Sequence, residues 1–218
     1  MAIKPILFNT EMVRAILDGR KTCTRRVAKN VPDHIHRIEP VYENGRFQFD
    51  CFYSSYVVAL DAYADFCMPC LPPYQQGDIL YVRETWSHPI VPSDKNRYVY
   101  RADEVAEDGF KNEAHIWHPS IHMPKEAARI WMKVTDVRVE RLQEITFDSC
   151  QNEGIYDDYK TYSEVYTNNL RRMAYPKVFA RLWNSTIKKS DLDRYGWNAN
   201  PWVWVIEFER CEKPKKEE

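Results

Sequence analysis

The chain has 218 residues and a formal net charge of −1, with 31 Lys and Arg against 32 Asp and Glu. This balance excludes a polycation that coats nucleic acid without selectivity, so any contact with RNA or DNA must come from a local basic patch. No run of about eighteen apolar residues and no signal-peptide pattern is present, so we expect a cytoplasmic protein without a membrane partner. The length is typical of one domain with a sizeable core.

The first expected element is a helix that ends near Gly19. Asn9 and Thr10 are N-cap candidates, and apolar residues recur behind them at helical spacing. Residues after Gly19 favour extended chain. The junction gathers four cations, Arg20, Lys21, Arg25 and Arg26. It is interpreted either as a solvated basic turn or as a functional site.

Alternating apolar and polar residues predict several strands along the chain. The expected segments are a hairpin over 35–53 with its turn at 43–46, a strand over 78–86, a long central strand over 128–142 and a strand over 202–208. A phase shift at Thr135 and Asp136 predicts a bulge in the central strand. The last strand is apolar on both faces, which predicts an interior position in the sheet.

Three later segments have the spacing of helices. Thr146 is expected to begin a short helix that Gly154 ends, which places Glu153 at the helix C-terminus. A tyrosine-rich segment over 155–174 is predicted to form an amphipathic helix that covers one end of the β-structure. The alternative is that its tyrosine rings stack on a nucleotide. Pro176 is expected to start a further helix.

The six cysteines of a cytoplasmic protein are expected to be reduced. Cys67-x-x-Cys70, with Cys51 upstream, offers three soft ligands of the kind that zinc binds. A single Cys-x-x-Cys without a second pair is weak evidence, and buried or incidental thiols are the alternative. We therefore expect no cofactor and no metal, with these three cysteines as the zinc candidates.

The motif Gly19-x-Lys21-x-x-Thr24-x-Arg26 resembles the signature of the ASCH domain family, small β-barrel proteins related to the PUA domains that bind RNA. The usual family pattern has a Glu where this chain has Thr24. A branch of amidohydrolases that act on N4-acetylcytidine shares this departure. The resemblance continues through residues 77–83 (GDILYVR), 145–153 (ITFDSCQNE) and 204–208 (WVIEF). Through residues 83–86, 119–124 and 197–202, the chain also resembles a longer form of the family that bacteriophages and prophages encode.

The resemblance implies an α+β fold: a PUA-like, curved, mostly antiparallel β-barrel with an N-terminal helix and peripheral helices. It implies a single domain over residues 1–210. Insertions are expected at about 28–73, 87–128 and 155–196, followed by a charged, frayed tail over 211–218.

By resemblance, Thr24 is the nucleophile of an amidohydrolase, Lys21 its proton acceptor and Glu153 its proton donor. Glu84 is the alternative acid. Because residues three apart on a regular strand point to opposite faces, Lys21 must lie before the strand or a bulge must intervene. We also expect that replacing Lys21, Thr24 or Glu153 leaves stability near that of the wild type.

The partner implied by the resemblance is a nucleoside or RNA. The candidate binding residues are Arg20, Arg25, Arg26, Arg83, Glu84 and Trp86. Two alternatives to the amidohydrolase remain. One is a non-catalytic reader of RNA or modified nucleic acid, and the other is a ribonuclease that uses Lys21, Arg25 and Arg26.

Overall fold

The structure is a computed structural model with a mixed α+β fold. It describes residues 1–32, 35, 37–43, 46–57, 62–89, 98–104, 116–155 and 164–214. The expected α+β class is confirmed.

Five strands form the main sheet, in the order β1-β6-β9-β10-β2. Their bounds are β1 Ile3–Leu7, β2 Cys23–Val27, β6 Ile79–Arg83, β9 Trp131–Arg141 and β10 Trp202–Cys211. β1 pairs with β6 in parallel, and the other three pairings are antiparallel. Within the described residues β1 and β2 are the two ends of the order, so the strand pairing does not close the expected barrel.

The centre of the sheet follows the predicted pattern. β10 lies between β9 and β2, and is therefore an interior strand. The β9–β10 register passes from Asp136 opposite Glu207 to Val134 opposite Phe208, which leaves Thr135 as an extra residue. The predicted bulge is confirmed, and it bends the sheet at this point.

The sequence analysis did not predict β1. Its sequence, IKPIL, contains a lysine and a proline, and proline cannot donate a hydrogen bond to a neighbouring strand. The strand forms at one end of the strand order, where only β6 pairs with it.

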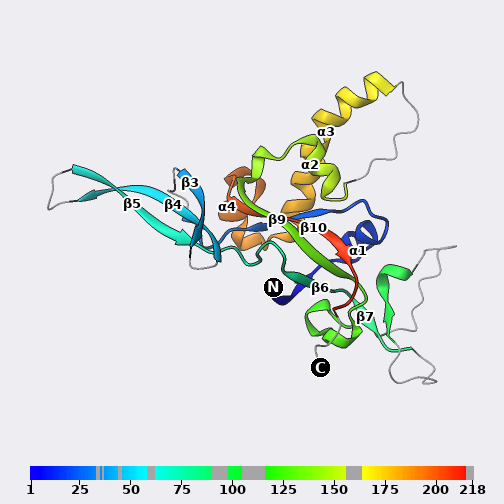
Figure 1. The fold of residues 1–218 in the computed structure, drawn as a ribbon. Coiled ribbons are helices and arrows are strands. Elements are labelled where there is room, and N and C mark those ends of the chain that lie inside the picture. The colour runs from blue at the N-terminus through cyan, green and yellow to red at the C-terminus, as the bar shows by residue number, and fades with distance from the viewer. Residues whose placement is uncertain are drawn as a thin grey trace.

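A second sheet contains β3 Arg37–Glu43, β4 Arg46–Val57 and β5 Ala62–Cys70, all antiparallel. The predicted hairpin is confirmed by the pairing of β3 with β4, while its turn residues 44–45 lie outside the described residues. This sheet extends away from the main sheet (Figure 1). Its near end joins the core, where the Phe49 ring lies 5.2 Å from the Trp204 ring. A short ladder of β7 Trp86–Ser87 and β8 Val99–Tyr100 follows.

The helices are α1 Thr10–Leu17, α2 Phe147–Asn152, α3 Glu164–Thr186 and α4 Leu192–Tyr195. Asn9 caps α1 and Thr146 caps α2 through side-chain hydrogen bonds, as predicted. None of the helices in the described part of the chain is long and apolar enough to cross a membrane.

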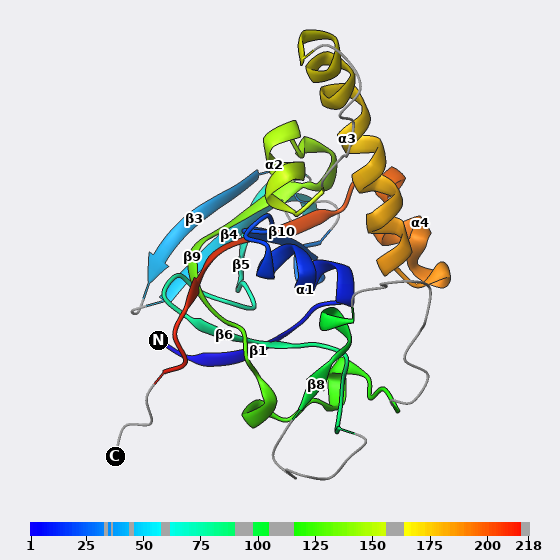
Figure 2. The same cartoon turned by 90° about the vertical axis from the view of Figure 1, so that its right-hand side faces the viewer.

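The helices cover opposite faces of the main sheet (Figures 1 and 2). Trp204, Ile206 and Phe208 on one face of β10 pack with residues of α1 and the second sheet. Val203 and Val205 on the other face pack with residues of α2 and α3. The alternation of β10 therefore separates two of the apolar clusters of the described residues from each other.

Two expected boundaries are wrong. Pro176 lies inside α3, because the helix continues through it to a C-terminal half anchored by buried Phe179 and Trp183. Cys211, expected to begin the frayed tail, is the last residue of β10 and pairs with Trp131. Residues 156–163, which carry three of the tyrosines of the expected covering helix, and 215–218 lie outside the described residues.

Candidate functional site

Lys21 lies in the turn between α1 and β2. Gly19 has φ of +74°, and the backbone N–H groups of Arg20 and Lys21 both donate to the Ala15 carbonyl oxygen. Lys21 then forms an isolated antiparallel bridge with Glu153, two residues before β2 begins. The predicted requirement that Lys21 precede the strand is met.

Glu153 is the C-cap residue of α2, as predicted. Gly154 follows it with φ of +89°, a conformation that favours glycine. A Cβ at position 154 would lie 2.8 Å from the Ala15 Cβ and 3.1 Å from the Lys21 Cβ. The absence of a side chain at Gly154 therefore lets the end of α2 approach α1 and the Lys21 turn closely.

A buried ion pair joins Lys21 to Glu153. Lys21 Nζ lies 2.6 Å from Glu153 Oε2 and also donates to the Glu153 carbonyl oxygen at 3.0 Å. The two side chains are 0% and 5% exposed. Burying two charges carries a large desolvation cost, which their mutual attraction and added hydrogen bonds offset only when the geometry is good.

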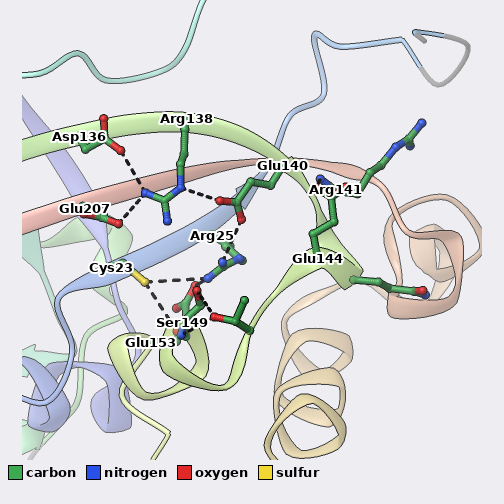
Figure 3. A network of polar contacts seen from close by, with 12 residues as sticks. Cys23, Arg25, Asp136, Arg138, Glu140, Arg141, Glu144, Ser149, Glu153 and Glu207 are labelled. Atoms are coloured by element: carbon green, nitrogen blue, oxygen red, sulfur yellow. Dashed lines mark hydrogen bonds and ion pairs between the residues drawn. The ribbon is translucent and has the colours of Figure 1, made fainter. Parts of the chain in front are cut away.

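Arg25 extends this pair into a network (Figure 3). One of its terminal nitrogens lies 3.4 Å from Glu153 Oε1, and the other lies 3.1 Å from Glu140 Oε2 on β9. Its Nε is buried and has no hydrogen-bond partner among the residues that the structure describes. Arg25 therefore divides its charge between two carboxylates that belong to different elements.

A second arginine continues the network toward the surface (Figure 3). Arg138 donates to Glu140 at 2.6 Å, to Asp136 at 3.0 Å and to Glu207. Burial lowers the pKa of Arg138, but its hydrogen bonds to the carboxylates of Glu140 and Glu207 outweigh burial and raise the pKa above the ordinary value. A continuous row of alternating charges thus runs from Lys21 across the sheet to Asp136.

Thr24 lies on the other face of β2 from Arg25, because side chains alternate along a strand. It pairs with Ile206, and the residue is 2% exposed. Within the described part of the chain, no hydrogen bond joins its hydroxyl to Lys21 or Glu153. Lys21 Nζ lies 5.7 Å from the Phe8 ring centroid, and Phe8 belongs to the apolar cluster on the Thr24 side of the sheet.

The three arginines around the motif have different environments. Arg20 donates to Asp18 and to the Gly154 carbonyl oxygen. Arg26 donates to the Leu7 carbonyl oxygen at 2.7 Å and lies over the Phe8 ring. Arg25 is buried between two carboxylates, so we now assign it to the buried network and not to a phosphate-binding surface.

Arg83, Glu84 and Trp86 lie at and beyond the end of β6. Arg83 donates to the Met123 carbonyl oxygen. Glu84 accepts two hydrogen bonds from Arg129, at 2.9 and 3.0 Å. Burial raises the pKa of Glu84, although Arg129 lowers it. Among the described residues, no hydrogen bond or ion pair joins these side chains to Lys21, Thr24 or Glu153.

Trp86 is buried and packs against the ring of His118, and its Nε1 has no hydrogen-bond partner within the described part of the chain. The link between this region and the motif is Phe8. Its N–H donates to the Arg83 carbonyl oxygen, while its ring contacts Lys21 and Arg26.

Of the three zinc candidates, Cys51 and Cys70 share a side-chain hydrogen bond, but Cys67 does not join them. Cys67 and Cys70 lie within β5, where residues three apart point to opposite faces. Cys67 is exposed, whereas Cys51 and Cys70 are buried. Burial raises the pKa of Cys51 and Cys70, which disfavours the thiolate that zinc requires.

Cys23 lies beside the ion pair, where its Sγ contacts Arg25 and the Ser149 carbonyl oxygen (Figure 3). Burial raises the pKa of Cys23 to about 12, and Glu153 adds to this effect. The thiol is therefore neutral and is not a nucleophile at ordinary pH.

The sequence analysis missed the carboxylate and arginine row on β9 and β10. A signal was present, because Asp136, Arg138 and Glu140 alternate in charge with a period of two, which places them on one face of a strand. Glu207 could not be added without the β9–β10 register, which places it opposite Asp136.

Comparison with protein-family models, curated proteins and solved structures finds no match to this chain.

Proposed function

We propose that the protein is an amidohydrolase that acts on an acylated nucleoside of the N4-acetylcytidine type, with a PUA-like, ASCH-type fold. The observation that supports the proposal is the buried contact of Lys21 with Glu153, because it holds an amine and a carboxylate together inside the protein, three residues before a threonine hydroxyl in the sequence. The neighbouring Thr24 supplies a hydroxyl three residues from Lys21.

The proposed reaction begins with attack by Thr24 Oγ1 on the acyl carbon, while Lys21 Nζ takes the hydroxyl proton. The C–N bond then breaks, and Glu153 gives its proton to the departing amine. This leaves an acyl ester on Thr24 and free cytidine. Water hydrolyses the ester to release the carboxylic acid and restores the hydroxyl.

The 2.6 Å contact between Lys21 Nζ and Glu153 Oε2 provides a route for the first proton transfer of this reaction. A proton that passes from Lys21 Nζ to Glu153 Oε2 converts the ion pair into a neutral amine and a neutral acid. These are the base and the acid that the reaction needs, and no proton is exchanged with solvent. Because Thr24 is 2% exposed, substrate binding must displace neighbouring side chains.

The test is incubation of the purified protein with N4-acetylcytidine, with cytidine release followed by liquid chromatography. Thr24→Val removes the hydroxyl at nearly constant volume and is expected to abolish release. Thr22→Val is the matched control, because Thr22 is exposed and lies outside β2. Equal turnover by both variants, or no turnover by the wild type, would overturn the proposal.

A non-catalytic reader of modified nucleosides is the second candidate. The observation that favours it is that the Lys21 ammonium donates to Glu153 and not to Thr24. A reader would bind N4-acetylcytidine in equilibrium dialysis and release it unchanged.

A further inference from the structure

The charge row that includes Arg25, Glu140 and Arg138 contacts the Lys21–Glu153 pair, but none of these three residues has a part in the proposed reaction. Arg25 is the connection, because its two terminal nitrogens lie 3.4 Å from Glu153 and 3.1 Å from Glu140. Arg138 holds the other oxygen of Glu140 at 2.6 Å. Arg25 therefore pairs with two carboxylates, and Glu140 pairs with two arginines.

We infer that Arg25, Glu140 and Arg138 are positioning residues for the Lys21–Glu153 pair. They set the pH range over which Glu153 carries the proton that it gives to the departing amine. The inference rests on the proposed function for its role in turnover. The electrostatic coupling itself follows from the contacts.

The coupling has a definite sign at each position. Glu140 competes with Glu153 for Arg25, so its carboxylate weakens the positive field on Glu153. Arg138 neutralises Glu140 and so weakens that competition. Removing the Glu140 charge therefore favours ionised Glu153, and removing the Arg138 charge favours its protonated form.

The other ionisable groups that face the cluster are Cys23 and Arg26 from β2, Cys150 from α2, Arg20 from the preceding turn, and Asp136 and Glu207 beside Arg138. Burial raises the pKa of both Cys23 and Cys150 to about 12, so neither thiol titrates near neutral pH. Arg20 and Arg26 keep their charges in the variants below, so they do not change the sign of the effect.

The row draws its members from two strands and the end of a helix. Glu153 comes from the end of α2, Arg25 from β2 and Glu140 and Arg138 from β9. Exposure rises along the row, from 0% for the Lys21 side chain to 35% for Arg138 and 51% for Asp136. The outer groups therefore respond to solvent and salt, whereas the inner pair is shielded.

The test uses protein labelled with ¹³C at the glutamate carboxyl carbon, with the Glu153 signal assigned by its loss in Glu153→Gln. Glu140→Gln is expected to move the midpoint of the Glu153 titration down by about half a pH unit or more, and Arg138→Gln to move it up. Arg138→Lys keeps the charge and is expected to restore most of the wild-type midpoint. Glu11→Gln, which also removes one partner of an arginine ion pair, is the control and is expected to leave the midpoint unchanged.

The pH profile of cytidine release is recorded on the same variants and is expected to move in the same directions. A midpoint that does not move in Glu140→Gln, or that moves the same way in both variants, overturns the inference even if the wild type is active. If Arg138→Gln does not fold, the inference is tested by comparing the Glu153 titration midpoint of Glu140→Gln with that of Glu11→Gln. Opposite shifts without any turnover leave the coupling standing and overturn the proposed function alone.

Discussion

Lys21 Nζ and Glu153 Oε2 lie 2.6 Å apart, although 132 residues separate them in the chain. Each residue comes from the end of a helix, Lys21 after α1 and Glu153 at the cap of α2. The contact therefore ties the N-terminal motif to the second half of the chain. It has both a structural and a chemical consequence, and the two can be separated by experiment.

Lys21→Met and Glu153→Gln are each expected to destabilise the protein by about 3–5 kcal/mol, because each leaves a buried charge without its partner. This revises the expectation from sequence that stability would stay near that of the wild type. The measurement is urea unfolding followed by circular dichroism.

The double variant Lys21→Met with Glu153→Gln separates the charge effect from packing. It removes both charges and is expected to recover at least half of the stability lost in either single variant, while remaining inactive. Losses that simply add in the double variant would show that the pair contributes through packing and not through charge.

Gly154 gives a second stability test. Gly154→Ala is expected to be more destabilising than Gly19→Ala by at least about 1 kcal/mol, since the added Cβ meets Ala15 and Lys21. Both glycines have positive φ, so both alanine variants carry a similar backbone cost. At Gly19 a Cβ would meet no atom of the described residues within 4 Å, which makes it the matched control. Equal urea midpoints for the two variants would contradict the close approach of α2 to α1.

The local elements of this fold could be predicted from sequence because their signals lie within a few residues. Asn9 and Thr146 mark helix starts, and the bulge at Thr135 follows from a phase shift in alternation. The pairing of Lys21 with Glu153 was expected only through a family resemblance, since nothing in local spacing joins residues so far apart.

The remaining features depend on tertiary contacts. β1 has a poor strand sequence and forms because β6 supplies its hydrogen bonds. Arg25 was predicted to bind nucleic acid because an arginine in a basic stretch of sequence is usually exposed. Its burial becomes intelligible only when β9 places Glu140, and α2 places Glu153, within reach.

Asp78 gives a prediction for acid stability. Burial raises the pKa of Asp78, but hydrogen bonds from Lys4 and from the backbone N–H groups of Ala2 and Gln75 outweigh burial and hold it below the ordinary 3.8. A lowered pKa means that the stabilisation is present above pH 3.8 and is lost as the pH falls through the value in the folded protein.

Asp78→Asn is therefore expected to cost about 1–2 kcal/mol at pH 7, with the difference from the wild type shrinking below pH 3.8. Urea unfolding at several pH values measures this. Asp18→Asn is the control, because Asp18 also pairs with a basic residue, Arg20, but is exposed. A difference that does not change with pH would show that the carboxylate acts through its shape alone.

Glu84 provides the opposite pH dependence and a test of which carboxylate is the acid. Burial raises its pKa above the ordinary 4.5, so the folded protein binds more protons there than the unfolded chain, and this contribution to stability falls as the pH rises above 4.5. The stability of Glu84→Gln relative to the wild type is therefore expected to improve from pH 4 toward neutrality, as measured by urea unfolding. Because Glu84 contacts Arg129 and not Lys21, the same variant is expected to keep most of its turnover of N4-acetylcytidine, whereas Glu153→Gln loses it. An inactive Glu84→Gln together with an active Glu153→Gln would move the proton donor to the end of β6.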